Sequence, residues 1–208
     1  MKKIYFLRSA SYDYRIPGMD LYDSFNAVIK KEITPELTET KEEFIKRLPG
    51  AIVALQTVFS SPDKRCLKTA GFLTHDYQSI DLLAEVRYVM DDFIKKDEFF
   101  KNGEPQVDKA RILFVKGLIS NSLQESYTSV MDRVMKLHSF INKQKSHEIV
   151  CISHGLMLKI VEAYFQNNDI VKKPSLLQKY FDGKTQPFSF GKGFRVDLGE
   201  DLVEVSYF

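Results

Sequence analysis

Three short apolar runs recur along this 208-residue chain, and they limit the folds that it can adopt. They cover residues 3–7, 57–59 and 148–152, and all are rich in β-branched and aromatic residues. Longer segments with helical spacing of apolar residues lie between them. Parallel strands need such long crossover connections, and strands alternating with helices are typical of α/β proteins. The sequence therefore predicts an α/β fold with a largely parallel central sheet.

Several helices and two further strands are predicted between and after these runs. A helix is predicted over residues 123–143, with apolar residues on one face at Tyr127, Val130, Val134, Leu137 and Ile141. Another follows Pro62, with Ser60 or Ser61 as its cap, and a third covers residues 40–48, where Thr40 and Glu43 have capping-box spacing. The tail, residues 187–208, alternates as two closing strands joined around Gly199.

The domain organisation is predicted to be simple. Hydrophobic residues make up 44% of the chain, which is enough for one core, and no linker or internal repeat divides it. Residues 12–35 and 91–122 have mixed polarity and weak periodicity, so we expect loops and short helices there, in the position of lids over one sheet edge. Residues 1–208 are therefore predicted to form a single domain.

Charge and cysteine usage exclude several classes of function. The 30 basic and 28 acidic residues alternate and form no basic stripe, so nucleic acid is not an expected partner. No apolar run approaches a membrane span, and the first one is too short for a signal peptide, so the expected location is the cytoplasm. Cys66 and Cys151 lack CxxC spacing, and the four histidines lack ligand spacing. We expect buried thiols, no metal and no cofactor.

Polar side chains follow each predicted parallel strand. The first strand ends in Arg8-Ser9, the second in Ser60-Ser61-Pro62 with Arg65 one turn later, and the third in Ser153-His154-Gly155. Taken individually, Arg8 could be a surface residue in an ion pair, Arg65 could lie on a solvated helix face, and His154 could be a loop histidine with satisfied hydrogen bonds. Together they lie at one edge of a parallel sheet, where ligands bind, and two guanidinium groups beside helix N-termini favour an anion. The sequence therefore predicts a site for a phosphate-bearing ligand.

The segments FLRSAS, VFSSPDKRCLKTA and IVCISHG resemble, in order and spacing, the signature blocks of the histidine phosphatase superfamily, also called phosphoglycerate-mutase-like. PELTET at 35–40, LLAEV at 82–86 and QES at 124–126 are weaker similarities, and LLAEV resembles the family's strand that carries its acidic residue. The resemblance implies a three-layer αβα sandwich and a phosphatase rather than a glycolytic mutase. It also implies a phosphate pocket of Arg8, Arg65 and His154, with Glu85 as general acid or base.

Three positions depart from the family pattern: Thr40 replaces an expected glycine, no glycine follows Glu85, and the nucleophile is absent. The family's nucleophile is the histidine directly after the first arginine, and Ser9 occupies that position here. A serine hydroxyl needs an adjacent base before it attacks, and a phosphoserine is about as stable as the ester from which it forms. Serine is also shorter than histidine, so its oxygen would lie too far from the phosphorus atom to attack it. We therefore expect phosphohistidine catalysis to be lost or disabled.

Four functions fit these observations. The first is a protein that binds a phosphate or a small phosphorylated molecule without catalysis. The second is a weak phosphatase that uses a water activated by His154 or Glu85. The third is an active phosphatase whose nucleophile has been substituted by serine. The fourth is a protein-interaction module with a relic pocket, whose candidate surface residues are Tyr12, Tyr14, Tyr22, Phe99 and Phe100.

Overall fold

The computed structural model describes residues 1–55, 57–181, 188–199 and 203–208. The first half of the chain contains β1 (Lys2–Arg8), α1 (Leu21–Ile29), α2 (Lys41–Lys46), α3 (Gly50–Val53), β2 (Val58–Ser60), α4 (Lys64–Leu73), β3 (Tyr77–Ser79), η1 (Asp81–Leu83), η2 (Met90–Asp92) and α5 (Lys96–Phe99). The second half contains β4 (Phe100–Lys101), β5 (Glu104–Pro105), α6 (Val107–Ile119), α7 (Tyr127–Lys143), β6 (Glu148–Ser153), α8 (Gly155–Gln166), η3 (Asn168–Val171), η4 (Pro174–Tyr180), β7 (Gly193–Leu198) and β8 (Val203–Tyr207).

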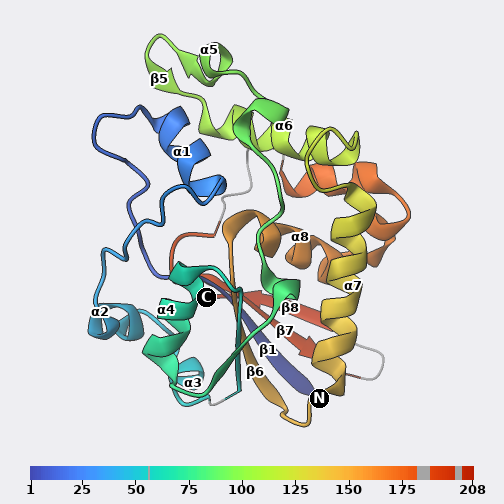
Figure 1. Cartoon of the computed structure of the whole chain (residues 1–208). Helices are drawn as coiled ribbons and strands as arrows, with labels where there is room; N and C mark the ends of the chain where they lie inside the picture. The colour runs from blue at the N-terminus through green and yellow to red at the C-terminus, as the bar shows by residue number, and fades with distance from the viewer. Residues whose placement is uncertain (56, 182–187, 200–202) are drawn as a thin grey trace.

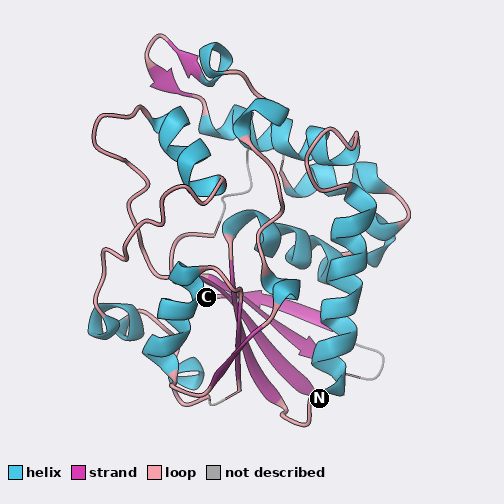
Figure 2. Ribbon diagram, viewed as in Figure 1, coloured by secondary structure: helices cyan, strands magenta, loops and turns pink. Residues whose placement is uncertain are grey.

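A six-stranded sheet with the order β3-β2-β6-β1-β7-β8 forms the centre of the molecule. The strands β3, β2, β6 and β1 pair in parallel, and β7 and β8 are antiparallel. Helices lie on both sides of the sheet (Figure 2). The α/β fold with a largely parallel sheet is thus confirmed.

Side chains of β1 alternate between two helical layers, as the two-residue period of a strand requires. Ile4 and Phe6 pack in a core with residues of α7 and α8, whereas Tyr5 and Leu7 pack in a second core with residues of α2, α3 and α4. All four side chains are buried. The three-layer αβα sandwich therefore follows from an uninterrupted apolar strand in the middle of the sheet.

Strand β7 closes onto β1 because one glycine allows a close approach. Gly193 lies opposite Leu7, and a Cβ atom built on Gly193 would lie 1.8 Å from the carbonyl oxygen of Phe6. The two closing strands predicted for residues 187–208 are present as an antiparallel pair. Residues 187 and 200–202 of that prediction lie outside the described residues.

Local capping explains where the helices begin. Thr40 and Glu43 form the predicted capping box at α2, with reciprocal hydrogen bonds of 3.3 and 2.8 Å. The cap of α4 was wrongly predicted: it is Asp63, whose side chain accepts from the amide of Arg65, and neither Ser60 nor Ser61 caps the helix. Aspartate is as good an N-cap as serine, and Asp63 is the residue directly before the first helical residue, Lys64.

Two further expectations differ from the structure. Residues 82–86 form the end of η1 and a loop rather than a strand. The parallel strand at the edge of the sheet is β3. Within residues 91–122, α6 is a 13-residue helix, longer than the short helices expected there. Its apolar residues are spread around the axis because it packs on both the main core and a smaller one, which weakens the helical period.

This smaller core stabilises the region expected to form lids. Tyr22, Met90, Ile94, Phe99 and Ala110 are its buried members, and all but Met90, the residue just before the second range, come from residues 12–35 and 91–122. Figure 1 shows α1, α5 and α6 grouped at one end of the molecule, away from the N-terminus. None of the helices in the described ranges has the length and apolar character needed to cross a membrane.

Candidate functional site

The carboxyl ends of three parallel strands meet beside a cavity of about 930 Å³. In the β1–β6 register Arg8 lies opposite Ser153, and in the β2–β6 register Ser60 lies opposite Ile152. The residues that follow each strand therefore reach the same place, and Arg8, Ser9, Ser61, Arg65, Glu85 and His154 all line the cavity. The predicted site residues are thus assembled around one opening.

Arg8 is held by the segment that precedes β7. One of its terminal nitrogens donates a 2.5 Å hydrogen bond to the carbonyl oxygen of Phe188, and its guanidinium lies 4.0 Å from the ring centroid of Phe190. A Cβ atom built on Gly155 would lie 3.5 Å from Cζ of Arg8, so the guanidinium rests against the first residue of α8. The positive charge is therefore fixed beside a helix N-terminus.

Arg65 is buried and faces the cavity from α4. Its guanidinium lies 4.8 Å from the ring centroid of Tyr12, and one terminal nitrogen lies 2.9 Å from Nδ1 of His154. Asp63 pairs with it at 3.5 Å. Nε of Arg65 is buried without a hydrogen-bond partner among the described residues. A buried donor of this kind is costly unless a ligand oxygen or a water satisfies it.

The hydrogen bonds of His154 define its protonation state. A guanidinium only donates, so Nδ1 accepts from Arg65 and the proton lies on Nε2, which donates to Oγ of Ser61 at 2.7 Å. Burial lowers the pKa of His154 well below its usual range, and the charges of Arg65, Arg8 and Lys31 lower it further. His154 is therefore a neutral hydrogen-bond donor at neutral pH.

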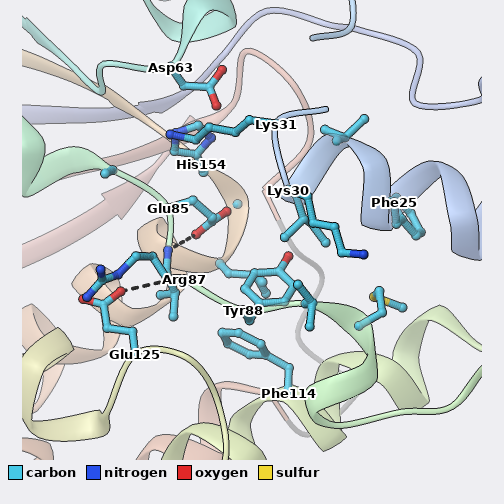
Figure 3. A pocket seen from close by; sticks show the side chains of 18 of the residues that line it. Phe25, Lys30, Lys31, Asp63, Glu85, Arg87, Tyr88, Phe114, Glu125 and His154 are labelled. Carbon is cyan, nitrogen blue, oxygen red and sulfur yellow. Dashed lines mark hydrogen bonds between the residues drawn. The ribbon is translucent and has the colours of Figure 1, made fainter. Parts of the chain in front are cut away.

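Glu85 lies on the loop after η1, with its carboxyl group inside the cavity (Figure 3). Oε1 accepts from the amides of Val86 at 3.1 Å and Met157 at 2.8 Å, the latter in the first turn of α8. Desolvation raises the pKa of Glu85, although these two bonds oppose the shift. Such a carboxyl group titrates closer to neutrality than an exposed one, which suits proton transfer.

The loop that carries Glu85 is clamped from the QES segment. The carboxylate of Glu125 accepts from the amide of Arg87 at 3.0 Å, and the amide of Glu125 donates to the carbonyl of Arg87 at the same distance. Arg133 pairs with Glu125 and donates to the carbonyl of Ala84. The backbone is thus fixed on both sides of Glu85. In the sequence, only the similarity of residues 124–126 to a family segment had indicated a role for Glu125.

Lys31 also lies at the cavity, and it was not among the predicted site residues. It follows α1 with φ of 61°, a left-handed conformation that favours glycine, and Lys31 lines the cavity. In Figure 3 its side chain extends toward His154. Residues held in unfavourable backbone conformations are concentrated at functional sites. A positive-φ lysine after a helix has no distinctive pattern in one sequence.

Ser9 lies directly after β1 and is 1% exposed. Its amide donates to the carbonyl of Ser153 at 3.2 Å, and its carbonyl accepts from Gly191 at 3.2 Å. Its backbone is therefore fixed between the end of β6 and the turn before β7, and the residue lines the cavity next to Arg8.

The residues proposed as an interaction surface occupy different environments. Tyr22 and Phe99 are 3% and 0% exposed, so they are core residues and that expectation was wrong for them. Tyr12 and Tyr14 line the cavity, and Phe100 is partly buried. Core packing accounts for Tyr22 and Phe99.

Cys66 and Cys151 are both buried free thiols, as expected. Sγ of Cys66 lies 3.6 Å from Nε2 of His154, and burial raises the pKa of both thiols. A thiol with a raised pKa is a poor nucleophile. No group of three His, Cys, Asp or Glu side chains arranged to hold a metal occurs in the described part of the chain.

Comparison with known proteins supports this architecture. The structure is similar to that of a phosphoserine phosphatase mutant from Entamoeba histolytica in complex with phosphoserine, with a TM-score of 0.62 and 15% sequence identity. The match covers 100% of this chain and 96% of the other. For the alpha-ribazole phosphatase from Shigella flexneri the coverage is 99% and 95%, with 14% identity and a TM-score of 0.58. No curated protein sequence matches the chain.

The family model described as histidine phosphatase superfamily (branch 1) matches residues 24–180. The chain belongs to the histidine phosphatase superfamily, and its fold is that of the phosphoglycerate-mutase-like phosphatases.

Proposed function

We propose that this protein binds a small phosphorylated molecule in the cavity and does not form a phosphohistidine. In this proposal Arg8, Arg65 and His154 bind the phosphate, with Nε2–H of His154 donating to a phosphate oxygen in place of Ser61, and Ser9 occupies the position of the family's nucleophile. The protein acts as a single domain over residues 1–208, with the cytoplasm as its expected location. It is thus a phosphatase-type member of the superfamily that has kept the ligand and lost the covalent step.

The observation that carries the proposal is the unsatisfied cationic end of the cavity. Two guanidinium groups and a neutral imidazole converge there, and Nε of Arg65 is buried without a partner among the described residues. A phosphate oxygen would accept from this nitrogen, and the ester's charge would offset that of the arginines. The side chain of Ser9 is shorter than that of histidine, so its oxygen does not reach the phosphorus atom of a phosphate bound there.

The test is binding of inorganic phosphate and vanadate to the intact chain, measured by titration calorimetry. Arg8→Ala is expected to weaken both at least tenfold, because a charge-assisted hydrogen bond contributes about 1.5–3 kcal/mol. Arg15→Ala is the matched control, since Arg15 is exposed and does not line the cavity. Equal affinity of Arg8→Ala and the unmodified protein would refute the assignment.

A second candidate function is slow hydrolysis by a water molecule that occupies the space of the missing imidazole. Glu85 is the better base for that water, because Nδ1 of His154 already accepts from Arg65 and Nε2 carries a proton. Oε2 of Glu85 makes no hydrogen bond within the described residues, and the pKa of the carboxyl group is raised. It can therefore accept a proton from water in the cavity.

The two candidates differ in turnover. Water-mediated hydrolysis requires release of phosphate by the unmodified protein without a labelled phosphoenzyme, and Glu85→Gln should abolish that release while preserving vanadate binding. A stable phosphoserine at Ser9 would exclude the water route, and no release above background leaves binding alone.

A further inference from the structure

Beyond the phosphate-binding end, the cavity is lined mainly by aromatic and aliphatic side chains. They come from residues 12–35 and 91–122, from the loop before η2 and from the first residue of η2, namely Tyr12, Tyr14, Phe25, Val28, Ile29, Tyr88, Val89, Met90, Phe93, Phe99 and Phe114. A volume of about 930 Å³ also greatly exceeds what a phosphate needs. The organic part of the ligand therefore faces this lining.

One group of rings leads directly away from the arginines. Arg65 stacks on Tyr12, the ring centroid of Tyr12 lies 5.2 Å from that of Tyr14, and Tyr14 lies 4.8 Å from Phe25. Phe25 in turn lies 6.2 Å from the buried ring of Phe99. These contacts form a continuous aromatic row that starts at the phosphate-binding end.

A second group of rings comes from other elements. Tyr88 lies 5.1 Å from Phe114 and 5.8 Å from Phe93, and Phe93 lies 5.8 Å from Phe114. Figure 3 shows the hydroxyl of Tyr88 pointing into the cavity near Glu85, with Phe114 behind its ring and Phe25 on another helix. Rings packed against one another in this way are rigid, so a ligand would meet preformed apolar surfaces.

The charges around this part of the cavity do not select a second anionic group. Arg111 reaches the lining from α6, but a 2.6 Å ion pair with Asp108 neutralises it. Lys30 and Lys31 are exposed at the rim. Thus, among the residues that the structure describes, no unneutralised cation is buried next to these rings, where a carboxylate such as that of phosphoserine would need a partner.

From these contacts we propose that the ligand is a phosphomonoester of an aromatic group about the size of one or two fused rings. The inference rests on the proposed phosphate site and names the class of ligand that it takes. The phosphate binds between Arg8 and Arg65, and the attached ring packs between the two groups of aromatic side chains. Edge-to-face and stacked contacts with these rings favour an aryl group over a short polar one.

The test compares three ligands of the intact protein by titration calorimetry: 1-naphthyl phosphate, O-phosphoserine and inorganic phosphate. We expect 1-naphthyl phosphate to bind at least tenfold more tightly than the other two. If all three bind with similar affinity, the phosphate site stands and the aromatic inference fails. If none binds, the proposed function fails as well.

A variant locates the discrimination in the ring lining. Phe25→Ala is expected to weaken 1-naphthyl phosphate about five- to tenfold and to leave inorganic phosphate unchanged. Phe140→Ala is the matched control, because Phe140 is also partly buried in a ring pair, with Phe59 at 4.9 Å, but lies outside the cavity. Equal weakening of both ligands by Phe25→Ala, or no weakening of either, would overturn the assignment of the ring to this lining.

Discussion

The guanidinium of Arg133 holds the carboxylate of Glu125 through two hydrogen bonds, Nε to Oε1 at 3.1 Å and a terminal nitrogen to Oε2 at 2.9 Å. Both side chains are largely buried, with exposed fractions of 14% and 5%. Because the same pair binds the backbone at Ala84 and Arg87, the position of Glu85 depends on this ion pair.

Removal of this ion pair is expected to destabilise the protein and displace Glu85. Arg133→Ala leaves Glu125 buried without its partner, which costs about 3–5 kcal/mol in the free energy of unfolding. Urea denaturation measures this change. Lys136→Ala on the same helix is the control, because its pair with Asp132 is exposed and contributes less than about 0.5 kcal/mol. Similar losses in the two variants would contradict a special role for the Glu125 pair.

Replacing Ser9 by histidine is expected to confer hydrolysis of a generic aryl phosphate. An imidazole at this position restores the nucleophile beside Arg8, and Glu85 is available for proton transfer. Phosphate release and a radiolabelled phosphoenzyme are the readouts, and Ser9→Asn controls for the added bulk. A Ser9→His protein that binds vanadate but releases no phosphate would show that more than the nucleophile is missing.

Two substitutions of Lys31 distinguish the effect of its backbone strain on stability from the effect of its charge on phosphate binding. Lys31→Gly relieves a left-handed conformation and is expected to raise the free energy of unfolding by up to about 1 kcal/mol. It should also weaken phosphate binding about two- to fivefold, because an ammonium beside the cavity is lost. Lys31→Met should weaken binding equally without the gain in stability. Asn102→Gly, at a φ of 53° outside the cavity, should not affect binding.

The lowered pKa of His154 predicts acid sensitivity of the fold. The unfolded histidine titrates near 6.5, whereas the folded one resists protonation, so its contribution to stability is present above about pH 6.5 and is lost as pH falls toward the folded pKa. His138, whose pKa burial also lowers, adds to the slope. In urea denaturation between pH 6.5 and 5, His154→Gln should reduce the slope. The exposed His75→Gln should leave it unchanged.

The sheet and the strand-end residues were predictable because both depend on local patterns. An apolar run such as residues 3–7 fits only a strand buried on both faces, and a parallel sheet brings the residues after its strands to one edge. Arg8, Arg65 and His154 were predicted as site residues for this reason, and the structure places all three around one cavity.

The missed features depend on contacts between distant segments. The support of Arg8 by Phe188 and Phe190 joins residues 180 or more positions apart, and no periodicity reports such a contact. Helix α6 packs on two cores, so its apolar residues do not lie on one face. The protonation of His154 depends on which donors surround it, and these are fixed only by tertiary structure.

The central place of β1 also determines when the cavity can form during synthesis. This first strand pairs with β6 on one side and β7 on the other, and Arg8 is held in place by residues 188 and 190. While the chain emerges from a ribosome, Arg8 is available long before its partners have been made. The cavity is therefore complete only after β7, which ends at Leu198, has left the exit tunnel, so a ligand of the proposed kind would not assist the early stages of folding.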